Sequence, residues 1–127
     1  MIYNGYDEYK IKYFSDPITG KSPVRVYIKS LPPKDRAKVY KYIELLRASD
    51  GYLNEPYSKY IEDGVRELIV DFARNRHRIF YFIFIKKTII MLHAFLKKTP
   101  KTPPNEIKRA KENHDLIIKN PKLYEED

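Results

Sequence analysis

Positively charged side chains are concentrated at the ends and turns of several predicted strands of this sequence. The set consists of Arg66, Arg74, Arg76, Arg78, Lys97, Lys98 and Lys101. A planar guanidinium group holds two phosphate oxygens at once, and a lysine adds a mobile point charge. Such a set can bind the phosphates of RNA and can stabilise the pentacoordinate phosphate of a phosphoryl transfer. The alternative is a hydrated basic face without chemistry, because charged residues are common at turns.

Two histidines, His77 and His93, lie near the same predicted turns and are the candidates for a general acid or base. His93 sits within an apolar run, which also suits a packing or hydrogen-bonding role. The nearby carboxylates are spread along two strands and form neither a D-x-D nor an H-E-x-x-H arrangement, so the sequence disfavours a metal nuclease. The whole chain has four glycines and no glycine-rich phosphate loop, and we expect neither a metal nor a cofactor.

Composition narrows the class of protein. The 127 residues include 25 Lys and Arg against 17 Asp and Glu, a formal net charge of +8. A small protein with this imbalance usually meets a polyanion, and nucleic acid is the leading candidate. The absence of cysteine excludes disulfides, thiolate catalysis and cysteine-bound metals. We expect no secretory signal and no membrane span, and therefore a soluble cytoplasmic protein.

The first half of the chain predicts one strand and two helices. Residues 8–14 alternate between tyrosine or isoleucine and charged residues, which is the period of a half-buried strand. Ser22 before Pro23 is a helix start signal, so we expect a short helix over 23–30 that ends at Pro32. Apolar residues at helical spacing predict a second helix over 34–48.

The second half predicts a sheet followed by a helix. The expected strands are 57–61, 65–72 and 78–95, the last one interrupted by a turn at Lys86-Lys87. Asp63-Gly64 favours a tight hairpin turn, and residues 73–76 form a second turn. Strands with such short links must be antiparallel neighbours, so the sheet is a meander to which the early strand is added at a position left open. A helix is expected over 104–118.

These elements predict an α+β fold with a small antiparallel β-sheet, an N-terminal helical pair and a C-terminal helix. Residues 1–127 are expected to form a single domain. We expect residues 1–7 and 120–127 to be loose.

Three motifs in the second half resemble those of the RelE/ParE superfamily of toxins. They are Asp63-Gly64-Val-Arg-Glu-Leu68, Arg78-Ile-Phe-Tyr-Phe82, and Phe95-Leu-Lys97-Lys98-Thr99-Pro-Lys101-Thr102-Pro103. More closely, they resemble the HigB-like toxins related to phage proteins, whose patterns are G-x-x-E-L-R, Y-R-I-x-Y-F and F-x-K-K-T-x-K-T-P. The resemblance covers about residues 55–115, and the third motif is the most specific of the three.

The resemblance implies a RelE-like fold and a type II toxin that cleaves mRNA on the ribosome. It implies a metal-independent endoribonuclease in which a ribose 2′-hydroxyl attacks the adjacent phosphate, which requires a base, charge stabilisation and an acid. The implied partners are mRNA, the ribosome and a cognate antitoxin, often a helix-turn-helix protein. Two alternatives stay open: a non-catalytic gyrase inhibitor of the ParE type, and a phage-derived nucleic-acid-binding accessory protein.

Carried over by position, the resemblance assigns catalytic roles to Arg78, Lys97 and Lys98. Two positions depart from the family pattern. The arginine expected after Leu68 is Ile69, and the tyrosine expected before Arg78 is His77. The first departure removes an expected phosphate ligand. Arg66 replaces it poorly because it points to the other face of a regular strand, unless a bulge intervenes. Arg74 or Arg76 on the adjoining turn would supply the charge instead, or the protein binds RNA or another target without efficient cleavage.

Two surfaces are candidates for contact with the antitoxin, which we expect to be acidic where it touches this basic protein. One is the basic face around Arg74, Lys97 and Lys101. The other is the outer side of the early helices, which we favour because four apolar residues there exceed what a small sheet needs to cover it. These four are Val24, Tyr27, Leu31 and Tyr40.

Overall fold

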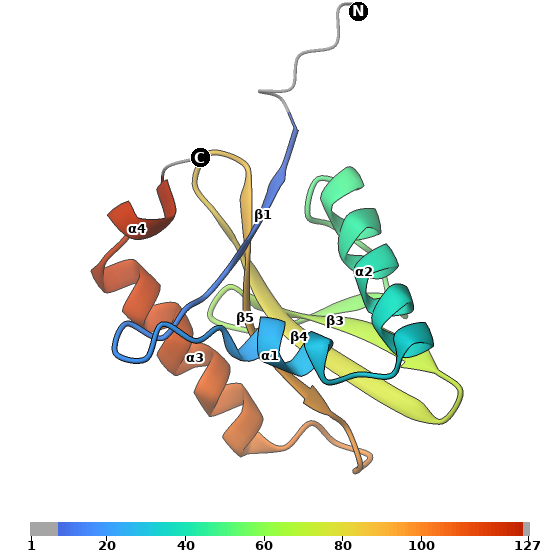
Figure 1. Ribbon diagram of the computed structural model, residues 1–127. Coiled ribbons are helices and arrows are strands. Elements are labelled where there is room, and N and C mark those ends of the chain that lie inside the picture. The colour runs from blue at the N-terminus through green and yellow to red at the C-terminus, as the bar shows by residue number, and fades with distance from the viewer. Residues whose placement is uncertain (1–7, 126–127) are drawn as a thin grey trace, which may run out of the picture.

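Nine helices and strands follow one another along residues 8–125, the part of the chain that the computed structural model describes (Figure 1). In chain order they are β1 (Lys10–Tyr13), α1 (Pro23–Lys29), α2 (Pro33–Ala48), β2 (Ser58–Glu62), β3 (Val65–Phe72), β4 (Asn75–Phe84), β5 (Thr88–Leu96), α3 (Pro104–Lys119) and α4 (Lys122–Glu125). The predicted α+β class is confirmed. Within residues 8–125, no helix combines the length and the apolar character that crossing a membrane requires.

The five strands form one sheet in the order β1-β5-β4-β3-β2. The four consecutive strands β2 to β5 are antiparallel, as their short connections predict. The early strand β1 joins the free edge of β5 and runs parallel to it, with Ile11 opposite Ile89. The turn between β3 and β4 is tighter than predicted: Ala73 adopts a φ of 55°, Phe72 pairs with Asn75, and Arg76 therefore lies in β4 and not in the turn.

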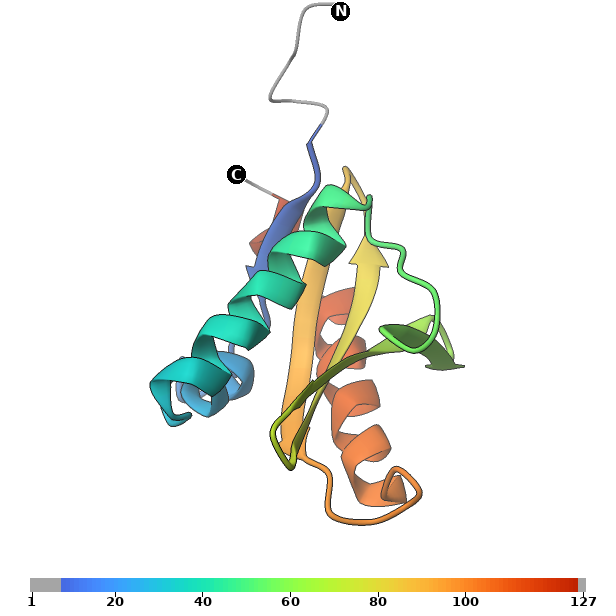
Figure 2. The same ribbon diagram turned by 90° about the vertical axis from the view of Figure 1, so that its right-hand side faces the viewer.

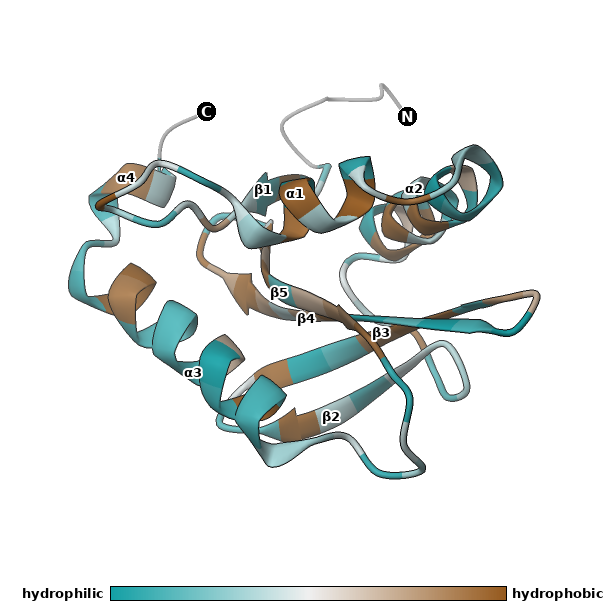
Figure 3. Ribbon diagram, turned by 60° about the horizontal axis from the view of Figure 1, so that its bottom comes forward, coloured by the Kyte–Doolittle hydropathy of each residue, from teal (hydrophilic) through white to brown (hydrophobic). Residues whose placement is uncertain are grey.

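Helices cover the sheet on both faces, which gives three layers (Figures 2 and 3). On one face, α1 and α2 pack on an apolar cluster that includes Val39, Leu46, Leu68 and Tyr81. On the other face, α3 packs on a second cluster, which includes Phe80, Phe82, Leu92, Phe95 and Ile117. Alternation along the strands produces the two clusters, because neighbouring residues of a strand point to opposite faces.

The two early helices begin at prolines, and α1 is capped by Ser22, whose hydroxyl accepts a hydrogen bond from the Arg25 backbone N–H at 3.3 Å. Val24 of α1 is fully buried, whereas Tyr40 of α2 is 44% exposed. The expected surplus of apolar residues on the outer side of these helices is therefore only partly present. Val26 and Leu45 are exposed there in addition to Tyr40.

The end of the chain is more ordered than expected. Residues 122–125, predicted to be loose, form α4, and Tyr124 is buried. Its hydroxyl accepts a hydrogen bond from the Ser15 backbone N–H at 3.0 Å, and Lys12 donates to its carbonyl at 2.8 Å. These contacts hold the C-terminal segment against β1 and the chain that follows it. The loose ends predicted at 1–7 and 126–127 lie outside the described residues.

Candidate functional site

A buried carboxylate on β3, Glu67, lies at the centre of a cluster of cations on the α3 face of the sheet. The side chain of Glu67 has no exposed surface. Its Oε1 lies 3.8 Å from Nζ of Lys59 and 3.9 Å from Nε of Arg78, while Thr102 donates a hydrogen bond to Oε2 at 3.2 Å. Within residues 8–125, neither Oε1 of Glu67 nor Nε of Arg78 has a hydrogen-bond partner. The carboxylate is therefore held mainly by the charges around it.

Arg78 faces Glu67 because β3 and β4 pair with Glu67 opposite Phe80 and Ile69 opposite Arg78. Its side chain is almost completely buried. Nη1 donates to Asp71 at 2.7 Å and to the His77 carbonyl at 3.0 Å. The carboxylates of Glu67 and Asp71 thus hold the guanidinium group in one position, where it is a fixed positive charge of the site.

Lys97 follows β5 and approaches the same cluster. Its backbone N–H donates to the Arg76 carbonyl at 2.8 Å, which brings the end of β5 beside β4. Burial lowers the pKa of the Lys97 ammonium, and the charges of Arg78, Lys59 and Arg76 lower it further, against an opposing effect of Glu67. Lys97 therefore loses its proton at a lower pH than an exposed lysine does. Lys98 and Lys101 are exposed in the chain that follows.

His93 lies on the same face, one layer deeper. Its ring packs against both Phe80 and Phe95, with centroid distances of 6.4 and 6.3 Å, and its Nε2 is 3.2 Å from Oε2 of Glu106 at the start of α3. Burial lowers the pKa of His93, although the hydrogen bond and charge of Glu106 act in the opposite direction. The lowered pKa favours the neutral imidazole, which can accept a proton, and the Glu106 carboxylate orients the ring.

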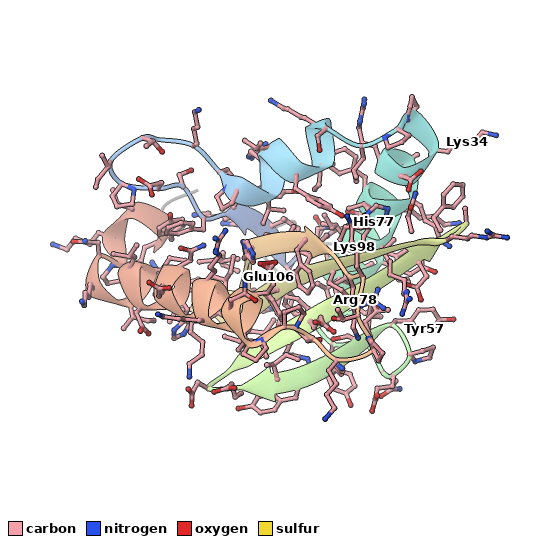
Figure 4. All side chains as sticks on the ribbon, turned by 90° about the horizontal axis from the view of Figure 1, so that it is seen from below. Lys34, Tyr57, His77, Arg78, Lys98 and Glu106 are labelled. Atoms are coloured by element: carbon pink, nitrogen blue, oxygen red, sulfur yellow. The ribbon has the colours of Figure 1, made fainter. Side chains whose placement is uncertain are left out.

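His77 belongs to a different network on the opposite face of the sheet (Figure 4). Its Nε2 lies 2.8 Å from Asp35 of α2 and its Nδ1 lies 2.7 Å from the Tyr27 hydroxyl of α1. Asn75 donates to the same Asp35 oxygen at 3.0 Å. The imidazole is 1% exposed. The structure therefore does not place His77 at the basic site as predicted, because neighbouring residues of β4 point to opposite faces and His77 bonds to the early helices instead.

The seven predicted cations do not form one cluster. Arg76 joins Arg78 and Lys97, whereas Arg74 is exposed in the turn before β4. Arg66 points to the α1 and α2 face, as strand alternation predicts, and its guanidinium carbon lies 5.3 Å from the centre of the Tyr52 ring. Arg66 therefore does not replace the arginine that the family pattern expects at position 69. Ile69 itself lies between Glu67 and Asp71 on the α3 face, opposite Arg78.

Sequence reasoning missed Lys59, Thr102 and Glu106 as members of the site. Lys59 reaches Glu67 because β2 pairs with β3 through a bulge between Tyr60 and Glu62, which shifts the register by one residue and sets Lys59 opposite Glu67. Regular pairing from the Asp63-Gly64 turn would have set Tyr60 there. Across residues 8–125, no three His, Asp or Glu side chains gather as ligands for a metal ion.

The fold and the site define a small α+β protein in which Lys59 and Arg78 flank a buried carboxylate on one face of a five-stranded sheet, with Lys97 and Arg76 close by. Residues 26–115 match the model of the phage-derived protein Gp49-like family (DUF891), and the chain belongs to that family. The phage-related part of the resemblance is thereby confirmed, and the HigB-like branch stays a prediction. No curated protein matches the chain.

Proposed function

We propose that this protein is a toxin of the RelE/HigB type that cleaves mRNA on the ribosome in the cytoplasm. The observation that carries the proposal is a group of cations on one face of the sheet. Lys59 and Arg78 lie 3.8 and 3.9 Å from Glu67, and Lys97 is close enough to interact with both of them and with Arg76, which gives four cations against two carboxylates when Asp71 is included. A cluster with this excess of positive charge is suited to a phosphate diester and to the additional charge of a phosphorane. Membership of the Gp49-like family is consistent with a toxin.

In the proposed reaction a ribose 2′-hydroxyl loses its proton to a base and its oxygen attacks the adjacent phosphorus. The bond from phosphorus to the 5′-oxygen then breaks, and the leaving oxygen receives a proton, which yields a 2′,3′-cyclic phosphate and a 5′-hydroxyl. Lys97 is the best candidate for contact with the phosphate, because it is only half-buried and its pKa is lowered. Arg78, held by Glu67 and Asp71, acts as a fixed charge behind it.

Lys98 and His93 have secondary roles in this proposal. Lys98 is exposed next to Lys97 and would bind a neighbouring phosphate. His93 would transfer a proton once the substrate opens a path to it, since Glu106 already orients its ring.

A second candidate function is supported by Ile69. An apolar side chain stands in the site where the family pattern has an arginine, and the site therefore has one phosphate ligand fewer. A protein with this change could bind RNA without efficient cleavage. No observation of this kind favours the other alternative, a gyrase inhibitor of the ParE type.

Expression of the protein alone in bacteria tests the proposal. Wild type should stop growth and produce new 5′-hydroxyl ends inside translated codons, and Lys97→Ala should reduce cleavage on the order of 10²-fold. Lys119→Ala, which changes an exposed lysine at the far end of α3, is the matched control and should cleave like wild type. Growth arrest with intact mRNA and damaged DNA would select gyrase inhibition, and RNA binding without new ends would select the second candidate.

We further propose that a cognate antitoxin, a helix-turn-helix protein with an acidic contact surface, covers the outer side of α1 and α2. Tyr40 and Leu45 are exposed on α2, which also carries the exposed Lys34 and Lys41, and Val26 is exposed on α1, a mixture that suits an acidic amphipathic partner. Val26→Glu with Tyr40→Glu should abolish binding of the antitoxin. If binding persists and Lys97→Glu with Lys101→Glu abolishes it, the antitoxin covers the basic site directly.

A further inference from the structure

Three tyrosines are exposed around the edge strand β2, outside the basic site. Tyr52 is 60% exposed, Tyr57 is 44% exposed and Tyr60 is 58% exposed. The aromatic side chains of this sequence are mostly buried or half-buried, and three large exposed rings at one edge are unusual. Strand β2 has a neighbour on one side only, since it ends the sheet order.

These rings are held in place by specific contacts and are not loose. The Tyr60 hydroxyl accepts a hydrogen bond from the Gly64 backbone N–H at 3.1 Å, across the hairpin turn. Tyr57 packs edge-to-face on Tyr42 of α2 with a centroid distance of 6.0 Å. Figure 4 shows Tyr57 near the start of β2. Rings fixed in this way lose little entropy when a ligand stacks on them.

Positive charge accompanies the rings. Arg66 lies opposite Tyr60 in the sheet, and its guanidinium carbon is 5.3 Å from the centre of the Tyr52 ring. Lys59, the residue before Tyr60, points to the other face and contacts Glu67 of the basic site. The edge strand therefore carries aromatic rings with an arginine on one face and a lysine of the basic site on the other.

We propose that Tyr52, Tyr57 and Tyr60, with Arg66, form a stacking surface for the bases of single-stranded RNA whose phosphate backbone continues into the basic site. This inference rests on the proposed function and adds a substrate-binding surface to it. Every base has a face that stacks on a tyrosine, so the surface would hold RNA of any sequence next to the phosphate that reacts. Exposed aromatic rings interleaved with cations are typical of proteins that bind single strands.

A binding measurement with RNA that cannot be cleaved tests the inference separately from the reaction. The probe is a fluorescein-labelled single strand of about 12 nucleotides with 2′-O-methyl riboses, a length within the range that one such domain covers. Fluorescence anisotropy at fixed salt gives the affinity. Tyr52→Ala and Tyr60→Ala should each weaken binding by about 5-fold to 100-fold, the range expected when one stacked base is lost. Tyr52→Phe and Tyr60→Phe keep the ring and should bind within about twofold of wild type.

Tyr40→Ala is the matched control, because this tyrosine has the same 44% exposure as Tyr57 but lies on the outer side of α2. It should bind RNA like wild type. Equal RNA binding by wild type and by both alanine variants would overturn the inference while the proposed function stands. The same result with loss of antitoxin binding in these variants would assign the surface to the protein partner instead. No binding of the single strand by wild type would count against the proposed function itself.

Discussion

Replacement of Arg78 by methionine should lower the free energy of unfolding of this protein, and the size of the effect follows from the structure. The guanidinium group is almost completely buried, and it lies 3.9 Å from Glu67, which has no exposed surface. Arg78→Met therefore removes the cation of a buried ion pair and leaves the carboxylate of Glu67 buried without it. Such losses cost about 3–5 kcal/mol in the free energy of unfolding. Lys59 remains 3.8 Å from the carboxylate, so we expect the lower end, about 3 kcal/mol.

A loss of this size is easy to measure. For a domain of 127 residues, 3 kcal/mol corresponds to a fall in the melting temperature of about 10 °C. Circular dichroism during heating gives the melting temperature, and urea titration gives the free energy of unfolding. Arg74→Met, at an exposed turn two residues before Arg76, is the control and should change the free energy by about 0.5 kcal/mol or less.

The double variant Glu67→Met with Arg78→Met separates the ion pair from the packing. An apolar pair beside Phe80 and Phe95 leaves no buried charge, so the double variant should be more stable than Arg78→Met alone. The reasoning would be refuted if Arg78→Met melts within about 3 °C of wild type, or if the double variant is the least stable of the three. Because Arg78 stabilises the fold, loss of toxicity in an Arg78 variant is interpretable only after this melt.

Three other predictions concern the histidines and Ile69. His77→Phe should lower the free energy of unfolding by about 2 kcal/mol in urea, because two hydrogen bonds of the imidazole are lost, while the folded fraction still cleaves RNA. Burial lowers the pKa of His93 in the folded state, so the unfolded chain binds the proton more readily. The free energy of unfolding should therefore fall as the pH falls through the ordinary histidine range. In a pH series of urea titrations, His93→Phe should show a smaller fall than wild type. Ile69→Arg, which puts a cation opposite Arg78 in the site, should raise RNA affinity and steepen its salt dependence by about one counterion, and an unchanged slope would show that position 69 does not reach the phosphate.

Local signals in the sequence determined most of the elements and their order. Proline at the start of α1, α2 and α3, and the turn residues at Asp63-Gly64, act within a few residues of their own position. Alternation along the strands then assigned Arg66 and Ile69 to opposite faces. The antiparallel meander followed from the shortness of the links, and the positive charge of the chain followed from its composition.

Only the tertiary structure decided which of these charges meet. The parallel pairing of β1 with β5 joins segments far apart in the chain, and no local residue signals it. The bulge between Tyr60 and Glu62 shifts the register by one residue and sets Lys59 opposite the buried Glu67. The position of α2 gives the buried His77 its partner Asp35, on the face of the sheet opposite the site. In each case the deciding contact lies between residues distant in sequence or depends on one extra residue in a strand, and the period of a pattern carries no information on either.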